Sequence, residues 1–143
     1  MTKICSKKLE TVVVSGILVI GVTLLGGCAE RITAIQAIKD ISLKEVYDLI
    51  GKNKDNQSFI IIDVRTPEEF ANEHIENAVN LDYYSEKFRD ELNKLDKEKT
   101  YLIYCRSGNR SGKALSIMKE LAFREIYNML GGIIQWKAEG YPL

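Results

Sequence analysis

The stretch YLIYCRSGNRSG, residues 101–112, contains two patterns that meet at one cysteine. Residues 101–105 are apolar or aromatic, which is typical of a short strand buried on both faces of a parallel sheet. Residues 106–112 then supply arginine, glycine and serine, and apolar residues return at helical spacing over residues 114–122. The sequence therefore predicts a strand, a loop and a helix in that order, with Cys105 at the end of the strand.

The rest of the chain repeats this alternation. Residues 59–64, FIIIDV, are a second buried strand, and the next segment begins with Thr66, Pro67 and Glu69, which match a helix N-terminus with a capping box. The other predicted elements are strands at residues 38–41, 78–81 and 125–130 and helices at residues 43–50, 85–95 and 133–140. Alternating strands and helices favour parallel pairing with right-handed crossovers, and hence a single α/β domain.

The N-terminus differs in composition from this domain. Three lysines lie among the first eight residues, and residues 11–27 are apolar or small with no charge, as in a membrane-targeting segment. The stretch ends in Leu-Gly-Gly-Cys28, which resembles the lipobox of bacterial lipoproteins. This resemblance implies a signal peptide at residues 1–27, lipidation of Cys28, a tether at residues 28–35 and the folded domain at residues 36–143.

An uncleaved membrane anchor is the alternative for this segment. Both alternatives predict an extracytoplasmic, membrane-attached protein of a bacterial cell envelope, because the N-terminal lysines stay inside. After cleavage and lipidation, Cys105 is the one remaining thiol, so it is either reactive or a buried small hydrophobe. The formal net charge of zero gives no bulk attraction for nucleic acid.

The loop after Cys105 favours the reactive alternative. Consecutive backbone N–H groups can surround the sulfur, because Gly108 allows an unusual turn and a helix is expected to begin near Asn109. The expected anion cradle consists of Arg106, Ser107, Gly108, Asn109, Arg110 and Ser111. Each of these features favours a thiolate, so the thiol needs no separate base, and we interpret the one histidine, His74, as a structural loop residue.

Four segments together resemble the rhodanese-like sulfurtransferase family. They are IIIDVR with TPEEF at residues 60–70, HIENAVN at residues 74–80, YCRSGNRS at residues 104–111 and LGGIIQWKAEGYP at residues 130–142. The resemblance covers about residues 36–143 and implies a central parallel five-stranded sheet flanked by helices on both faces. It also implies a sulfurtransferase that moves sulfane sulfur, with no cofactor and no metal.

The resemblance implies roles for individual residues. Cys105 would be the nucleophile and persulfide carrier, while Arg106 and Arg110 would attract an anionic donor such as thiosulfate or a persulfide. Asp63 and Arg65 would hold neighbouring loops. The sulfur acceptor would be a thiol or cyanide, and a protein acceptor is also possible.

Two further expectations, and one departure from the family pattern, concern residues around these motifs. We expect Arg65 to pair with Glu68 or Glu69, and Trp136 to pack in the core. The family usually has glycines around the His-Ile pair, where this chain has Glu73 before it and Glu76-Asn77 after it.

Two other functions remain open at this point. Cysteine-dependent phosphatases and arsenate reductases place five residues between their cysteine and arginine, whereas four residues separate Cys105 from Arg110, and Ser111 occupies the sixth position. The shorter loop therefore encloses less volume, which is enough for one added sulfur atom but tight for a tetrahedral phosphate. A thiol-based redox or sulfide-sensing module, or a binding module, is the second alternative.

Overall fold

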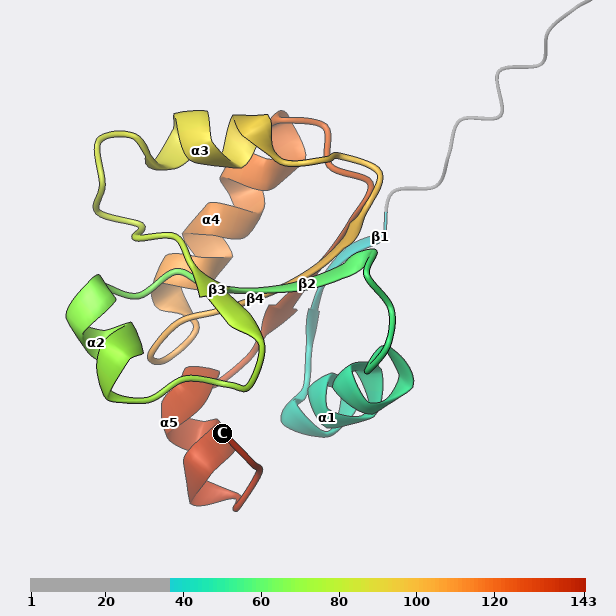
Figure 1. Ribbon diagram of the computed structural model, residues 1–143, viewed down its shortest axis with the longest axis vertical. Coiled ribbons are helices and arrows are strands. Elements are labelled where there is room, and N and C mark those ends of the chain that lie inside the picture. The colour runs from blue at the N-terminus through green and yellow to red at the C-terminus, as the bar shows by residue number, and fades with distance from the viewer. Residues whose placement is uncertain (1–36) are drawn as a thin grey trace, which may run out of the picture. The chain divides into compact units, whose positions relative to one another are not determined.

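The computed structural model describes residues 37–143, in which five strands form one parallel sheet with helices on both of its faces (Figure 1). The strands are β1 (Ala37–Ile41), β2 (Phe59–Asp63), β3 (Ala78–Asn80), β4 (Thr100–Tyr104) and β5 (Glu125–Met129). The helices are α1 (Leu43–Lys52), α2 (Pro67–Asn72), α3 (Phe88–Lys94), α4 (Asn109–Glu120) and α5 (Gly132–Ala138). The predicted fold class is confirmed.

The expected signal segment, Cys28 and the tether lie outside the described residues. Within residues 37–143, none of the helices has the length and apolar character needed to span a membrane.

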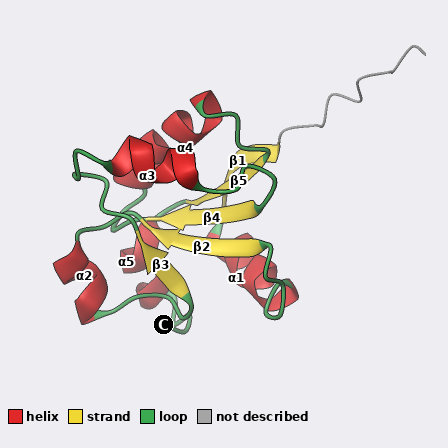
Figure 2. Cartoon of the chain, turned by 45° about the horizontal axis from the view of Figure 1, so that its top comes forward, coloured by secondary structure: helices red, strands yellow, loops and turns green. Residues whose placement is uncertain are grey.

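The strand order is β1-β5-β4-β2-β3, and every neighbouring pair is parallel. Strand β4 is central, between β5 and β2, as Figure 2 shows, and four of its five residues are buried. Tyr101, Ile103 and Cys105 pack in the cluster that includes side chains of α3 and α4. Leu102 and Tyr104 pack in the cluster that includes side chains of α1 and α5. This two-sided burial explains why the β4 sequence is continuously apolar.

Helix α2 begins as the sequence predicts. The Thr66 side chain accepts a hydrogen bond from the Glu69 N–H, the Glu69 side chain accepts one from the Thr66 N–H, and Pro67 occupies the first turn. Helix α3 begins at Phe88, later than predicted, because the Ser85 hydroxyl accepts from the Lys87 N–H and forms a turn before the helix.

The carboxyl ends of β2 and β4 place the predicted site residues at one edge of the sheet. Asp63 of β2 is the register partner of Tyr104 of β4. Arg65 follows Asp63 by two residues, and Cys105 directly follows Tyr104. This edge is where the loops of a parallel α/β sheet form binding sites.

Candidate active site

Cys105 is buried at the start of the loop between β4 and α4, and its sulfur faces the backbone of that loop. The Gly108 N–H donates to Cys105 Sγ over 3.2 Å, and the Ser111 hydroxyl lies 3.5 Å from the same atom. Gly108 has a φ of 95°, so the turn uses the left-handed region that glycine occupies without strain. The structure thus brings the middle of the loop and the first turn of α4 around the sulfur.

The surroundings of Cys105 act on its pKa in opposite directions. Burial raises the pKa of the Cys105 thiol, whereas hydrogen bonds from the Ser111 hydroxyl and from backbone N–H groups of Ser111, Ser107 and Gly108 lower it. The hydrogen bonds outweigh burial, and the pKa lies below its ordinary value. The site therefore stabilises a thiolate through neutral donors in the loop.

The start of α5 supports the loop from behind. The carbonyl of Cys105 accepts from the Ile133 N–H over 2.9 Å, and the carbonyl of Arg106 accepts from the Ile134 N–H over 3.2 Å. Gly132 has a φ of 60°, and a Cβ atom there would lie 2.5 Å from the Arg106 carbonyl. Directing these carbonyls toward α5 leaves the loop N–H groups for the sulfur side. The Gly131-Gly132 pair was visible in the sequence as a signal for a close backbone contact. The sequence did not show that this contact is with the Cys105 loop.

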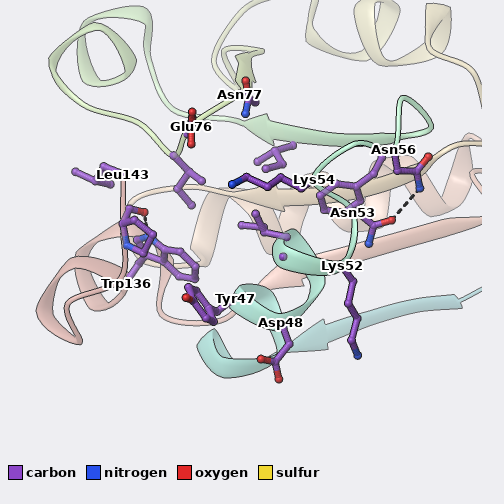
Figure 3. Close-up of a pocket in the computed structure, with 16 residues that line it drawn as sticks. Tyr47, Asp48, Lys52, Asn53, Lys54, Asn56, Glu76, Asn77, Trp136 and Leu143 are labelled. Atoms are coloured by element: carbon purple, nitrogen blue, oxygen red, sulfur yellow. Dashed lines mark hydrogen bonds between the residues drawn. The ribbon is translucent and has the colours of Figure 1, made fainter.

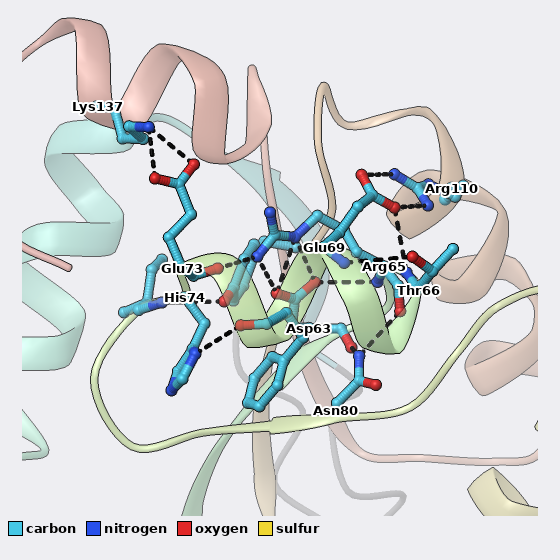
Figure 4. Close-up of polar contacts among 12 residues, drawn as sticks. Asp63, Arg65, Thr66, Glu69, Glu73, His74, Asn80, Arg110 and Lys137 are labelled. Carbon is cyan, nitrogen blue, oxygen red and sulfur yellow. Dashed lines mark hydrogen bonds and ion pairs between the residues drawn. The ribbon is translucent and has the colours of Figure 1, made fainter.

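Arg110 is held by a carboxylate of α2. Its Nη1 lies 2.6 Å from Glu69 Oε2 and its Nη2 lies 2.8 Å from Glu69 Oε1, and Figure 4 shows the two parallel contacts. Hydrogen bonding to Arg110 lowers the pKa of Glu69 to about 2. The Arg110 guanidinium also lies 5.5 Å from the centre of the Tyr84 ring. Sequence reasoning missed both partners.

Arg106 differs from Arg110 in its surroundings. Arg106, Ser107 and Asn109 are exposed, and the ion pairs within residues 37–143 do not include Arg106. The two arginines predicted to attract an anion are therefore unequal, because only Arg106 presents an uncompensated charge to solvent.

Asp63 and Arg65 form a buried pair. Arg65 Nη2 donates to Asp63 Oδ2 over 2.6 Å and to the carbonyl of Glu73 over 2.6 Å (Figure 4). Asn80 donates to the carbonyls of both residues. The expected pairing of Arg65 with Glu68 or Glu69 is wrong, because the guanidinium pairs with Asp63 at the end of β2, two residues before it, and Glu69 pairs with Arg110.

His74 lies in the loop after α2 and contacts Phe70 of that helix. Its Nδ1 lies 2.9 Å from the Phe70 carbonyl, and its ring stacks on the Phe70 ring at 3.9 Å between centroids.

Asn77 has a φ of 62°, so an asparagine adopts the left-handed conformation near the point where the family usually has a glycine. Trp136 is buried against Tyr141, in agreement with its expected packing role.

A cavity of about 640 Å³ lies elsewhere, beside α1 (Figure 3). It is lined by Tyr47 and Lys52 of α1, by Lys54 and Asn56 of the following loop, and by Trp136, among others, and it includes no residue of the Cys105 loop. Among the described residues there is also no cluster of side chains that could hold a metal ion.

The fold and the site define a class of protein: a parallel α/β domain in which a buried cysteine follows the central strand and receives hydrogen bonds from the loop after it. Within this class, the family model described as a rhodanese-like domain matches residues 42–139, and the chain belongs to that family.

Known relatives and solved structures agree with this membership. The chain is 36% identical over 100 residues to a protein of Coxiella burnetii named thiosulfate sulfurtransferase GlpE, which covers 70% of this chain and 88% of the relative. It also resembles a rhodanese-related protein from Thermoplasma volcanium, with a TM-score of 0.62, 30% identity and coverage of 73% and 95% of the two chains. A rhodanese-like domain protein from Staphylococcus aureus gives a TM-score of 0.59 and 32% identity over 71% and 94% of the chains.

Proposed function

We propose that this chain is a rhodanese-type sulfurtransferase in which Cys105 carries the transferred sulfur as a persulfide. The observation that carries the proposal is the position of Cys105 Sγ, 3.2 Å from the Gly108 N–H and 3.5 Å from the Ser111 hydroxyl. These donors favour a thiolate, and they also suit the terminal sulfur of a persulfide anion. The names of the curated relatives support the same reaction class.

The proposed reaction has two steps. The Cys105 thiolate attacks the outer sulfur of thiosulfate, a new S–S bond forms on Cys105, and sulfite leaves with the electron pair of the broken bond. A cyanide ion or an acceptor thiolate then attacks the terminal sulfur of the persulfide. Thiocyanate or a new persulfide leaves, and the Cys105 thiolate is regenerated. A protein thiol is an equally suitable acceptor for this chemistry.

The loop residues have different parts in this proposal. The backbone from Arg106 to Ser111 stabilises the sulfur anion, and Arg106 attracts the donor because its charge is exposed. Asp63 and Arg65 hold the loops at the sheet edge through their buried pair. No metal or cofactor takes part in the proposed steps.

The mass of the protein tests the proposal. After incubation of the purified protein with thiosulfate, we expect a gain of about 32 Da for one sulfur atom, which cyanide then removes as thiocyanate. The gain should be absent in Cys105→Ser. If no sulfur is gained from thiosulfate, from polysulfide or from glutathione persulfide, the transfer function is wrong. A persulfide that no acceptor discharges would instead support a sensing module.

We also propose that the protein is a membrane-attached lipoprotein outside the cytoplasm, on the basis of the lipobox-like stretch before Cys28. Cys28→Ala is expected to block lipidation and to leave an unprocessed chain in bacterial cells. Incorporation of labelled palmitate by the wild type but not by the variant tests this proposal. Equal labelling of both proteins, or of neither, would contradict it.

A further inference from the structure

We propose that Glu69 is a specificity-determining residue for the sulfur donor. Because Glu69 holds Arg110 in an ion pair, it lowers the preference of the site for doubly charged donors over singly charged donors. The inference rests on the proposed sulfur transfer. It concerns a residue of α2 that lies 41 positions from its partner in the sequence.

The geometry shows how completely Arg110 is occupied. Both terminal nitrogens of its guanidinium face the two oxygens of Glu69, at 2.6 and 2.8 Å. The Thr66 N–H donates to the same carboxylate over 3.1 Å, which fixes Glu69 within the first turn of α2. Tyr84 lies beside the guanidinium, and the Arg110 side chain is only 13% exposed. A donor anion therefore cannot use this guanidinium fork unless the ion pair breaks.

The charges lead to the effect on specificity. Glu69 is ionised and compensates Arg110, so the pair acts on a donor as a dipole and not as a full positive charge. Arg106 then supplies the one uncompensated charge of the loop. Attraction to a free Arg110 would be greater for a dianion than for a monoanion, and Glu69 removes that difference.

The test compares two donors that differ in charge but release a similar leaving group. Thiosulfate is a dianion that releases sulfite, and methanethiosulfonate is a monoanion that releases a sulfinate. The measured quantity is kcat/KM for persulfide formation by the purified full-length protein at low ionic strength. In Glu69→Gln, we expect the ratio of kcat/KM for thiosulfate to that for methanethiosulfonate to rise about threefold or more.

Matched variants separate this effect from a loss of charge or of folding. Glu68→Gln removes an exposed carboxylate from the same helical turn without touching Arg110, and it should leave the ratio unchanged. Arg110→Gln leaves Glu69 uncompensated, and the ratio should fall below that of the wild type. The double variant should return the ratio close to the wild-type value.

The outcomes also separate the two proposals. If the wild type forms a persulfide with both donors but the ratio does not rise in Glu69→Gln, the role of Glu69 is wrong and the sulfur transfer stands. An equal rise in Glu68→Gln also overturns that role. If the wild type forms no persulfide with either donor but gains sulfur from polysulfide or glutathione persulfide, the role of Glu69 in donor choice is wrong and the sulfur transfer stands. If it gains sulfur from none of these donors, both proposals are wrong.

Discussion

Replacing Gly132 by alanine is expected to deform the loop around Cys105. A Cβ atom at residue 132 would lie 2.5 Å from the carbonyl carbon and oxygen of Arg106 and 2.6 Å from the carbonyl oxygen of Cys105. These are backbone atoms, so a change of rotamer cannot relieve the contact. The left-handed φ costs about 1–2 kcal/mol, and losing the two hydrogen bonds from α5 costs about 1 kcal/mol each. We therefore expect a loss of about 3–4 kcal/mol in the free energy of unfolding.

Gly140→Ala is the matched control for this prediction. Gly140 also has a positive φ, of 79°, but nothing lies within 4 Å of a Cβ atom there, so only the backbone cost applies. Urea unfolding should show that Gly132→Ala is less stable than Gly140→Ala by about 2 kcal/mol, the cost of the two hydrogen bonds. The rate of persulfide formation should fall at least about tenfold in Gly132→Ala and stay at the wild-type value in Gly140→Ala. Equal stabilities together with an unchanged rate would refute this account of the loop.

Three other substitutions test single contacts. Ser111→Ala removes a donor to the Cys105 thiolate, so the pH midpoint of Cys105 alkylation by iodoacetamide should rise; an unchanged midpoint would contradict the assigned role of the hydroxyl. Asp63→Asn leaves Arg65 charged and buried without its carboxylate, so urea unfolding should show a loss of about 3–5 kcal/mol in the free energy of unfolding. A loss within experimental error would contradict a stabilising role of the Asp63–Arg65 pair. The pKa of Glu69 is lowered from 4.5 to about 2, so its contribution to folding stability is fully present above pH 4.5 and is lost as the pH falls toward 2. Glu69→Gln should flatten that part of the stability profile, and identical acid profiles of the two proteins would rule out this contribution.

The fold could be predicted from the sequence because its signals are local. The continuously apolar sequence of β4 predicts burial on both faces. The capping box at Thr66 predicts that α2 begins at Pro67, as it does in the structure. The start of α3 was harder to predict from the sequence, because the charged residues before Phe88 are compatible with either a helix or a turn. There, the Lys87 N–H donates to the Ser85 hydroxyl and the Phe88 N–H donates to the Ser85 carbonyl, and both hydrogen bonds favour the turn.

The pairings within the site could not be predicted in the same way. The sequence shows which residues are charged, but Arg65 and Arg110 each had several carboxylates within reach. The partner of Arg110 is settled by the fold, since α2 and α4 both begin at the carboxyl edge of the sheet and bring Glu69 next to Arg110. The contact of Tyr104 could not be predicted either. Its hydroxyl accepts a hydrogen bond from the Ile75 N–H, 29 positions away, and no local sequence pattern indicates this contact.

The ion pair of Arg110 also bears on the choice between sulfur and phosphate. A phosphatase arginine must offer its guanidinium fork to the oxygens of the phosphate. Here the fork is taken by Glu69, whose pKa of about 2 keeps it ionised at neutral pH, so binding a phosphate would require breaking a charged pair. A sulfur atom carried by Cys105 does not require that pair to break, because the Gly108 N–H and the Ser111 hydroxyl, which face Cys105 Sγ, are donors independent of Arg110. We therefore expect no release of phosphate from an aryl phosphate ester, either by the wild type or by Glu69→Gln; release by the wild type that Cys105→Ser abolishes would reverse this argument.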